Sequence, residues 1–259
     1  MRAHAAARGD GARPLHRRLF RQPASDFIAQ HRLGKVAEDY VSKFSYACTG
    51  VDLESITALD FCNVSQGLVL PIYRFSFDAV AERGRLGSRL VDATVTAHTE
   101  KGGLHEVACS DGRTIQARNV VFATPASVTA QFLELGQIRD ACRLYVDHVR
   151  GTLRPGLDRE QMNLFPFSSP IIFTAVQDDG THLVYARERQ IDLGDLFVEY
   201  TVLGRREWEK AMYVSGRAYV EQQYGPSTFV AGDHNGLGLE PAAISGVYAA
   251  RQILKTLPR

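Results

Sequence analysis

The stretch whose residue types best suit chemistry lies near the carboxyl terminus, at residues 227–246. Residues 228–231 are apolar and partly β-branched, which predicts a strand buried on both faces that ends at Gly232 and Asp233. Pro241 then stands where a helix tolerates proline, in its first turn. The start of that helix offers unpaired N–H groups and a positive dipole end to an anion or to a carbonyl-rich ring. The pattern indicates either a ligand site or an ordinary strand–helix connection.

The predicted helix after Pro241 carries two sets of side chains. Apolar residues recur at helical spacing and form one stripe, made of Ala243, Val247, Ala250 and Leu254. Small residues are also frequent, namely Ala242, Ser245, Gly246, Ala249 and Ala250. We therefore expect this helix to approach a neighbouring element closely.

A second apolar run, residues 119–125, ends at a proline and also predicts a strand buried on both faces. Before it, residues 88–98 and 104–109 read as a strand pair joined by Lys101-Gly102-Gly103, and residues 114–117 as a brief strand after a turn. The two buried strands flank a long excursion. This layout predicts an α/β (α+β) fold in which a second domain is inserted into a sheet domain.

The segment between the two buried strands has a different pattern of residues. Residues 127–135 and 138–149 read as helices, and residues 171–176, 182–187 and 196–203 alternate as strands. Residues 205–210 mix bases and acids around Trp208, which favours a solvated amphipathic turn over a nucleic-acid patch.

Composition excludes several classes of protein. The chain has 259 residues, of which 45% are hydrophobic and 23% charged, and its net charge is +1, so neither a nucleic-acid partner nor an acidic one is indicated. No apolar run approaches the roughly 18 residues that span a bilayer. The four cysteines form no Cys-x-x-Cys pair, which suits reduced thiols in the cytoplasm and predicts no metal centre. Residues 1–22 are rich in arginine and predict a basic disordered tail.

Two segments, taken in order, resemble the flavin-containing amine oxidase superfamily, which includes phytoene desaturase-like and protoporphyrinogen oxidase-like enzymes. Residues 111–125 (DGRTIQARNVVFATP) are similar to that family's DG-x-x-x-x-A-x-x-V-V-x-A-T-P hairpin and strand. Residues 229–250 are similar to its carboxyl-terminal flavin motif. The likeness covers residues 65–125 and 205–256, and it is weak elsewhere.

The resemblance implies a partial FAD-binding Rossmann-like sheet domain of the glutathione-reductase type, with an inserted mixed substrate domain. After the tail at 1–22, residues 23–64 would be a helical part of the substrate domain and residues 65–125 the middle of the FAD-binding domain. Residues 126–222 would continue the substrate domain, and residues 223–259 would supply the last strand and helix of the FAD-binding domain.

The same resemblance implies a set of FAD-binding residues: Val95, Ala123, Thr124, Pro125, Gly232, Asp233, Pro241, Ala242 and Ala243. Asp233 would bind the ribityl hydroxyls, and a turn or helix-cap aspartate is the alternative. The backbone of residues 241–243 would face the N1–C2 carbonyl edge of the flavin. The backbone at Val95 would contact adenine, or else pack as sheet core. Residues 123–125 would lie near the adenosine diphosphate.

Catalytic residues are less defined, because in such enzymes the flavin itself accepts the hydride. Many amine oxidases place a lysine near flavin N5, and Lys210 is the only lysine between Pro125 and Asp233, although a surface turn is the simpler interpretation. Tyr213, Tyr219 and Tyr224 could line the pocket or pack in the core. His234 and Asn235 belong to the flavin loop and could face the ring, and an exposed loop residue is the alternative for His234. No general base is assigned.

One family feature is not found in the sequence. The Gly-x-Gly-x-x-Gly turn packs a dinucleotide pyrophosphate on a helix N-terminus. Both Gly-x-Gly pairs of this chain, at residues 9–14 and 236–241, have proline at the third glycine position. We therefore expect the carboxyl-terminal portion of a flavoprotein: a truncated product, a misread frame, or one subunit that needs a second chain carrying the βαβ unit. FAD binding by this chain alone is not implied.

The sequence thus predicts an FAD-dependent oxidoreductase, or part of one, that dehydrogenates a C–N or C–C bond of a small molecule by hydride transfer. The alternative is a non-catalytic or partner-requiring subunit or remnant that completes a flavoprotein supplied by another chain. A carrier of an apolar ligand is a third possibility. The substrate is not implied, since Arg187, Arg189 and Arg205 could each be a clamp or a solvated side chain.

Overall fold

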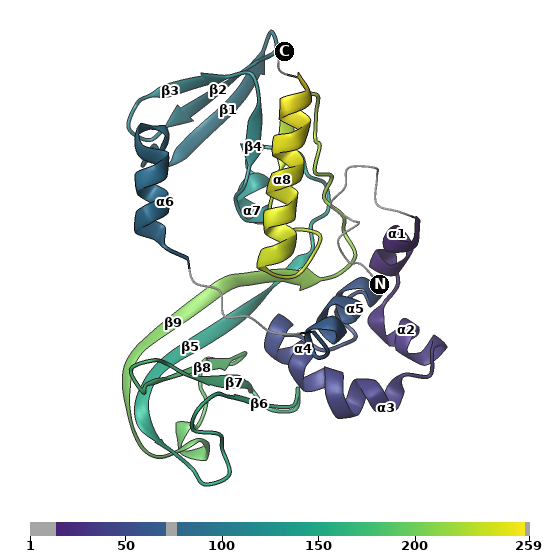
Figure 1. Ribbon diagram of the computed structural model, residues 1–259, viewed down its shortest axis with the longest axis vertical. Helices are drawn as coiled ribbons and strands as arrows, with labels where there is room; N and C mark the ends of the chain where they lie inside the picture. Colours follow the sequence, from purple (N-terminus) through teal and green to yellow (C-terminus); the bar gives the residue numbers. More distant parts are fainter. Residues whose placement is uncertain (1–13, 71–76, 257–259) are drawn as a thin grey trace.

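The computed structural model describes residues 14–70 and 77–256, and the chain has a mixed α/β fold (Figure 1). One group of elements contains α6 (Ala79–Leu86), α7 (Ala126–Thr129), α8 (Leu239–Thr256) and the strands β1 to β4 and β10. The other contains the helices α1 to α5 and the strands β5 to β9. The long strands β5 (Asp140–Leu153) and β9 (Phe197–Ser215) join the two groups.

An antiparallel meander is made of β1 (Val95–Lys101), β2 (Leu104–Cys109) and β3 (Thr114–Ala117). Lys101 pairs with Leu104 across a turn in which Gly102 and Gly103 have φ of 60° and 76°, as a two-residue hairpin requires. The predicted hairpin is confirmed. Its first strand begins later than expected, because residues 87–89 form a 3-10 turn after α6.

The two apolar runs identified in the sequence lie side by side. β4 (Val120–Phe122) and β10 (Thr228–Val230) pair in parallel, with Phe122 opposite Val230. Every residue of β10 is buried, as predicted. β4 is different, since Val121 is 37% exposed, so the prediction of burial on both faces is wrong for this strand. The reason is that, among the described residues, β10 is the only strand that pairs with β4.

The second sheet has the order β6–β7–β8–β5–β9, with β6 at Met162–Leu164, β7 at Ile171–Val176 and β8 at His182–Ala186. A short 3-10 turn, Leu193–Asp195, leads into β9. The predicted strands at 171–176 and 182–187 are confirmed. The third, predicted at 196–203, begins at 197 and runs on to 215, so residues 205–210 are part of a strand and not a turn.

The helix predicted at residues 138–149 is wrong, because this segment is the strand β5. Register shifts near Cys142 and near His148 interrupt the strand's pairing with β9. A bulge adds one residue to a strand and breaks the alternation of its side chains. The buried residues of β5 therefore fall at irregular intervals, which imitates the spacing of a helix: Cys142, Leu144, Asp147, Val149 and Leu153.

The basic tail predicted at 1–22 is also partly wrong, and residues 1–13 lie outside the described residues. α1 (Pro14–Arg21) is helical, with Leu19 and Phe20 buried. The Phe20 ring contacts Tyr219 edge-on at 5.6 Å between centroids. Burial of these two apolar side chains outweighs the repulsion among the arginines, so the segment is part of the fold.

The remaining helices form a bundle beside the second sheet (Figure 1). They are α2 (Ala24–Gln30), α3 (Gly34–Val36), a π-helical turn (Ala37–Val41), α4 (Ser42–Thr49) and α5 (Ala58–Gly67). A capping box starts α5: Asp60 N–H donates to Thr57 Oγ1, and Thr57 N–H donates to Asp60 Oδ2 at 3.2 Å. This box turns the Asp60 carboxylate toward the sheets.

A buried ion pair between Asp60 and Arg139 connects the bundle to the sheets. Both side chains are almost fully buried, and Arg139 Nη2 donates both to Asp60 Oδ2 and to the backbone carbonyl of Val214. The guanidinium also lies 5.4 Å from the centre of the Phe20 ring. One arginine therefore holds α5, the residue before β5, the end of β9 and α1 together.

We expect substitution of Arg139 to destabilise the whole chain. Arg139→Met leaves the Asp60 carboxylate buried without a partner, which costs about 3–5 kcal/mol. Arg143→Met is the matched control, because Arg143 is half-exposed on β5 and pairs with Glu207 and Glu209 at the surface, a loss of no more than about 1 kcal/mol. Urea unfolding of both variants measures the difference. Equal losses in the two would contradict the structural role given to Arg139.

Candidate functional site

The parallel pairing of β4 and β10 brings two sequence motifs to one edge. The Ala231 N–H donates to the Phe122 carbonyl at 2.9 Å, so residues 123–125 and residues 232–233 leave the sheet side by side. Ligands of α/β folds bind where the carboxyl ends of parallel strands meet. Of the predicted cofactor-binding residues, Ala123, Thr124 and Pro125 are exposed at this edge, and Gly232 and Asp233 are partly exposed.

The turn after β10 is tied to the first turns of α8. Gly232 N–H donates to Ser245 Oγ at 2.7 Å, and Ser245 Oγ also lies 2.6 Å from the Ala242 carbonyl. Ser245 is itself buried on the face of α8 that packs on the turn. The sequence marked Ser245 only as a small residue, and its bond to Gly232 was missed. Its one sequence signal is a hydroxyl placed one turn after Pro241, among the small and apolar residues of the first half of the helix.

Gly232 is required by both conformation and space. Its φ is 144°, a region that other residues rarely adopt, and a Cβ added there would lie 3.2 Å from His234 Nε2. Gly236 is similarly restricted, since its Cβ would lie 3.0 Å from Pro241 Cβ. Asp233 therefore belongs to a turn in which Gly232 and Gly236 both pack too closely for a larger residue.

His234 is the most unusual side chain of the turn. Its ring is 5% exposed, and within the described residues neither ring nitrogen has a hydrogen-bond partner. Burial lowers its pKa, and the nearby Asp233 carboxylate opposes that shift only in part. Buried polar atoms without a partner are rare and mark a place where a ligand or water completes the bonding. The histidine therefore makes this turn a candidate for ligand binding.

Asp233 and Asn235 have different roles. The Asp233 carboxylate accepts no hydrogen bond from the part of the chain that the structure describes. The Asn235 amide, by contrast, is bonded to Val220: it accepts from the Val220 N–H at 2.8 Å and donates to the Val220 carbonyl at 2.6 Å. The amide therefore fixes the turn to the segment before β10, and its position facing a flavin ring stays a prediction.

The first turn of α8 also contributes to the edge. α8 begins at Leu239, so Pro241 stands in its first turn as predicted, with Ala242 partly exposed and Ala243 exposed. Within this turn Pro241 has no N–H, and the Ala242 N–H donates to the Gly238 carbonyl at 3.4 Å. The helix presents its apolar stripe to solvent, since Val247 and Leu254 are 51% and 66% exposed. Its small-residue face, with Ser245 and Ala249, is the one that packs.

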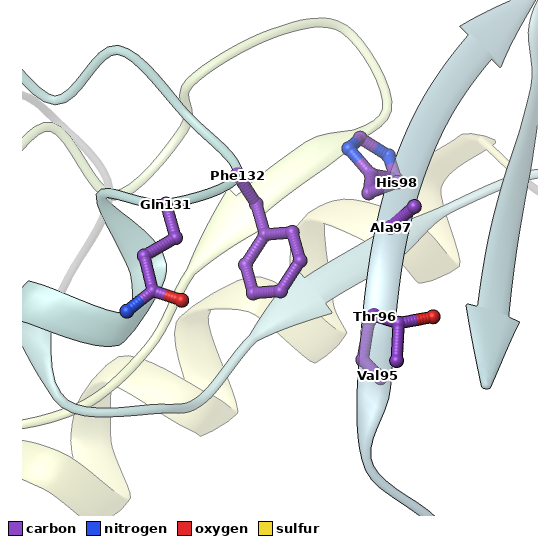
Figure 2. Close-up of a pocket in the computed structure, with 6 residues that line it drawn as sticks. All are labelled: Val95, Thr96, Ala97, His98, Gln131 and Phe132. Carbon is purple, nitrogen blue, oxygen red and sulfur yellow. The ribbon is translucent and has the colours of Figure 1, made fainter. Parts of the chain in front are cut away.

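Val95 lies away from this edge, on the meander. It is 38% exposed, so it is not sheet core, and it lines a hollow of about 520 Å³ (Figure 2). The other lining residues are Thr96, Ala97, His98, Gln131 and Phe132. The hollow lies between β1 and the segment that follows α7, and Phe132 stacks on Phe122 of β4 at 5.9 Å. Thr124 bonds instead to Thr129 of α7, with 2.9 Å between hydroxyl oxygens.

A chain of polar side chains that sequence reasoning missed joins the meander to β10. His98 Nε2 lies 3.1 Å from His105 Nδ1, and His105 Nε2 lies 2.8 Å from Ser227 Oγ, just before β10. His105 is fully buried. Burial, reinforced by His105, lowers the pKa of His98. The hairpin register alone places His98 diagonally across from His105, so this pair could have been found from the sequence.

The candidate catalytic residues are accounted for by other contacts. Lys210 is exposed on β9. The Tyr213 hydroxyl donates to Ser127 Oγ at 2.6 Å, and the Tyr224 hydroxyl accepts from the Glu134 N–H at 3.1 Å. Tyr219 packs on Phe20, and burial raises its pKa. These contacts favour packing roles for the three tyrosines.

Two absences concern the described residues alone. Within residues 14–70 and 77–256, no helix has both the length and the apolar content to cross a bilayer. The same part of the chain contains no group of three or more histidine, cysteine, aspartate or glutamate side chains that could hold a metal ion.

Comparisons with known proteins give a fold but no close relative. No protein-family model matches the sequence. No curated protein matches it either. Solved structures do match, at low identity. A putrescine oxidase variant redesigned in cofactor binding has a TM-score of 0.64 and 14% identity, with 98% of this chain and 72% of that one covered.

Two further structures give the same picture. An oxidoreductase from Methanosarcina mazei has a TM-score of 0.62 and 11% identity, with 89% of this chain and 68% of that one covered. Cyclohexylamine oxidase from Brevibacterium oxydans has a TM-score of 0.58 and 12% identity, with 94% and 70% covered. Over most of its length the chain therefore shares the fold of flavin amine oxidases and related oxidoreductases, which confirms the resemblance seen in the sequence.

We expect Gly232→Ala to destabilise the site. An alanine at φ 144° that also presses on His234 costs about 1–3 kcal/mol. Gly246→Ala is the control, since Gly246 is inside α8 with open space around it, and alanine there stabilises the helix by about 0.5–1 kcal/mol. Opposite signs in urea unfolding are the expected result. A neutral Gly232→Ala would show that the turn is not fixed.

His234 predicts a pH dependence of stability. Its folded-state pKa lies below the ordinary value of about 6.5, so the unfolded chain takes up the proton first. The stability that this residue contributes is present above about pH 6.5 and is lost as the pH falls from there through the folded-state pKa. His234→Leu removes this loss and the two unpaired nitrogens, so the variant should lose less stability than wild type between about pH 7.5 and pH 5.5. Urea unfolding at both pH values measures this, and an unchanged loss would contradict the assignment.

Proposed function

We propose that this chain is part of an FAD-dependent oxidoreductase that dehydrogenates a C–N or C–C bond by hydride transfer to flavin. The observation that carries the proposal is the fold: 98% of the chain aligns with a flavin amine oxidase at a TM-score of 0.64. A second support is the position of residues 123–125 and 232–233, which follow the carboxyl ends of β4 and β10, the edge at which α/β folds bind their ligands.

The residues at this edge fit a flavin. The Asp233 carboxylate is free to accept hydrogen bonds from ribityl hydroxyls, and the positive dipole end of α8 would face the carbonyl edge of the ring. Gly232 and Gly236 leave no side chain in the way, and His234 supplies buried polar atoms that lack a partner. When bound, the flavin would supply the acceptor for the hydride.

The chain's own contribution to the reaction would be to position the flavin and to exclude water. The positive end of α8 would stabilise negative charge that develops on the ring. The substrate would be a small molecule held over this edge by the second sheet. Two arginine candidates for a substrate clamp are otherwise engaged, since Arg187 lies 4.5 Å from the Phe167 ring and Arg205 pairs with Asp147 at 3.2 Å.

A second candidate function is a subunit that works only with a partner. It is favoured by Val121, an exposed valine on a strand that was expected to be buried. A pyrophosphate normally gains several charge-assisted bonds at a glycine-rich turn, each worth about 1.5–3 kcal/mol. The sequence shows no such turn, so we propose that tight FAD binding needs a second chain that carries the glycine-rich βαβ unit.

Titration with FAD tests the proposed function. Purified protein, alone and with its partner, should acquire the yellow absorbance of oxidised flavin. Asp233→Ala should weaken FAD binding about 10- to 150-fold, the equivalent of about 1.5–3 kcal/mol for a bond to a charged group. Asp92→Ala is the control, because Asp92 is 92% exposed before β1 and should leave binding unchanged.

Absence of flavin absorbance under every condition would refute the oxidoreductase proposal. Equal effects of the Asp233 and Asp92 substitutions would refute the role of Asp233 alone.

A further inference from the structure

We propose that His98, His105 and Ser227 form a latch between the meander and the β4–β10 pair, which holds with one bound proton or none and opens when a second proton binds. The proposal does not depend on the proposed function, because it concerns a contact between two sheets of this chain. It follows from hydrogen-bond geometry, from burial and from the number of hydrogens that the three side chains can share.

The latch lies where two sheets meet without a ladder. The meander β1–β2–β3 and the pair β4–β10 are separate sheets, and no ladder joins them within the described residues. Side chains make the connection. His98 on β1 lies edge-on to the Phe122 ring of β4, with 5.1 Å between ring centres. His105 on β2 reaches Ser227, the residue before β10, with 2.8 Å between Nε2 and Oγ. The latch therefore supplies hydrogen bonds where no ladder does.

Each gap of this chain of side chains holds one hydrogen. His98 Nε2 and His105 Nδ1 are 3.1 Å apart, so one of the two nitrogens donates and the other accepts. The same holds for His105 Nε2 and Ser227 Oγ. Two neutral rings meet both requirements, in either direction along the chain.

One added proton also fits. A doubly protonated His105 donates from Nδ1 to His98 and from Nε2 to Ser227, so each of its N–H groups has an acceptor. His105 is fully buried, and a buried charge is costly unless it is paired. Glu100 Oε2 lies 3.9 Å from His105 Nδ1 and offsets part of that cost.

A second added proton does not fit. It places an N–H group on both His98 Nε2 and His105 Nδ1, which then face each other without a lone pair between them. The two charged rings, 5.3 Å apart between centres, also repel each other. Burial, reinforced by His105, already lowers the pKa of His98, in agreement with this count. The second proton therefore breaks the bond between the rings.

The surroundings of the two rings give little further compensation. Within the described residues, Glu100 is the only carboxylate within 4.0 Å of a ring nitrogen of His98 or His105. The other neighbours are uncharged, namely Ala117 of β3, Phe122 of β4, and Gln131 and Phe132 after α7. One carboxylate can balance one positive ring but not two.

Opening of the latch reaches the hollow on the meander. His98 lines this hollow of about 520 Å³, opposite the segment that follows α7 (Figure 2). When the bond to His105 is lost, nothing in the latch fixes the ring that forms this wall. Acid should therefore loosen the hollow together with the contact between the sheets.

A nitrogen–nitrogen scalar coupling across the hydrogen bond reports the latch directly. Histidines of the full chain are labelled with nitrogen-15, and the coupling between His98 Nε2 and His105 Nδ1 is followed from about pH 7.5 to about pH 5, on either side of the ordinary histidine pKa of about 6.5. It should be present at the upper pH and lost at the lower, while circular dichroism still shows the native fold.

Three results of this measurement would overturn the proposal. The first is the absence of the coupling at about pH 7.5, and the second is its persistence at about pH 5. The third is a loss of the coupling only together with the native circular dichroism signal, which would assign the loss to unfolding of the whole chain.

The counter-charge is tested by a variant at an exposed position. Glu100→Gln removes the carboxylate beside the rings, so the second proton should bind at lower pH and the coupling should persist to a lower pH than in wild type. Glu106→Gln is the matched control. Glu106 follows His105 on β2, points to the other face of the meander and bonds to Gln116 at 3.0 Å. Equal midpoints in the two variants would overturn the role given to Glu100.

Unfolding in urea measures the same proton. The unfolded chain takes up a proton that the folded latch refuses, so stability present above about pH 6.5 is lost as the pH falls. Between about pH 7.5 and pH 5.5, the unfolding equilibrium constant should rise about tenfold more in wild type than in His98→Gln, whose amide can bond to His105 but does not titrate. His31→Gln is the control, an exposed histidine at the end of α2, and should keep the wild-type pH dependence. Equal pH dependence in His98→Gln and wild type would overturn the proposal.

Discussion

The buried pair of Asp60 and Arg139 is the interaction on which the rest of the structure depends. Burying two charges away from water is costly unless they are paired, and here the Thr57 cap and the Val214 carbonyl add hydrogen bonds to the ion pair, although Arg139 Nε has no partner among the described residues. The pair stands where β5 begins and β9 ends, so it fixes the point at which the chain leaves the large sheet. β10 and α8 follow that point along the chain, whereas β1 to β4 precede the pair.

The candidate site inherits its geometry from this junction. A few residues after Val214, the backbone of Val220 is clamped by the Asn235 amide, and Asn235 belongs to the turn that holds Asp233 and His234. Ser245 ties the same turn to α8. The turn is therefore fixed by side chain-to-backbone bonds between segments that are distant in sequence, while the Asp233 carboxylate and the His234 ring have no hydrogen-bond partner among the described residues.

Sequence reasoning succeeded where local patterns decide the structure. The Gly102–Gly103 hairpin, the strand at 228–230 and the proline in the first turn of α8 each follow from backbone preferences or from an unbroken apolar run. It failed at β5, where bulges shift the alternation toward a helical interval, and at α1, where two buried apolar residues outweigh the basic run. The role of Asn235 could not be predicted, because its partner Val220 is brought to it only by the tertiary fold. The exposure of Val121 also required the structure, since the sequence cannot show which neighbour a strand lacks.

The 19-residue strand β9 gives the large sheet a long open border, and its charges have a consequence for how the protein behaves in solution. Glu207 and Glu209 pair with Arg143, and Arg205 pairs with Asp147, all across the β5–β9 ladder. Another strand that added to this border would have to strip water from these groups, so the border resists amyloid-like stacking of one molecule on the next. The short border at β4 has no such charges. Of the two edges, the β4 edge is therefore the one more open to unwanted pairing with strands of other molecules.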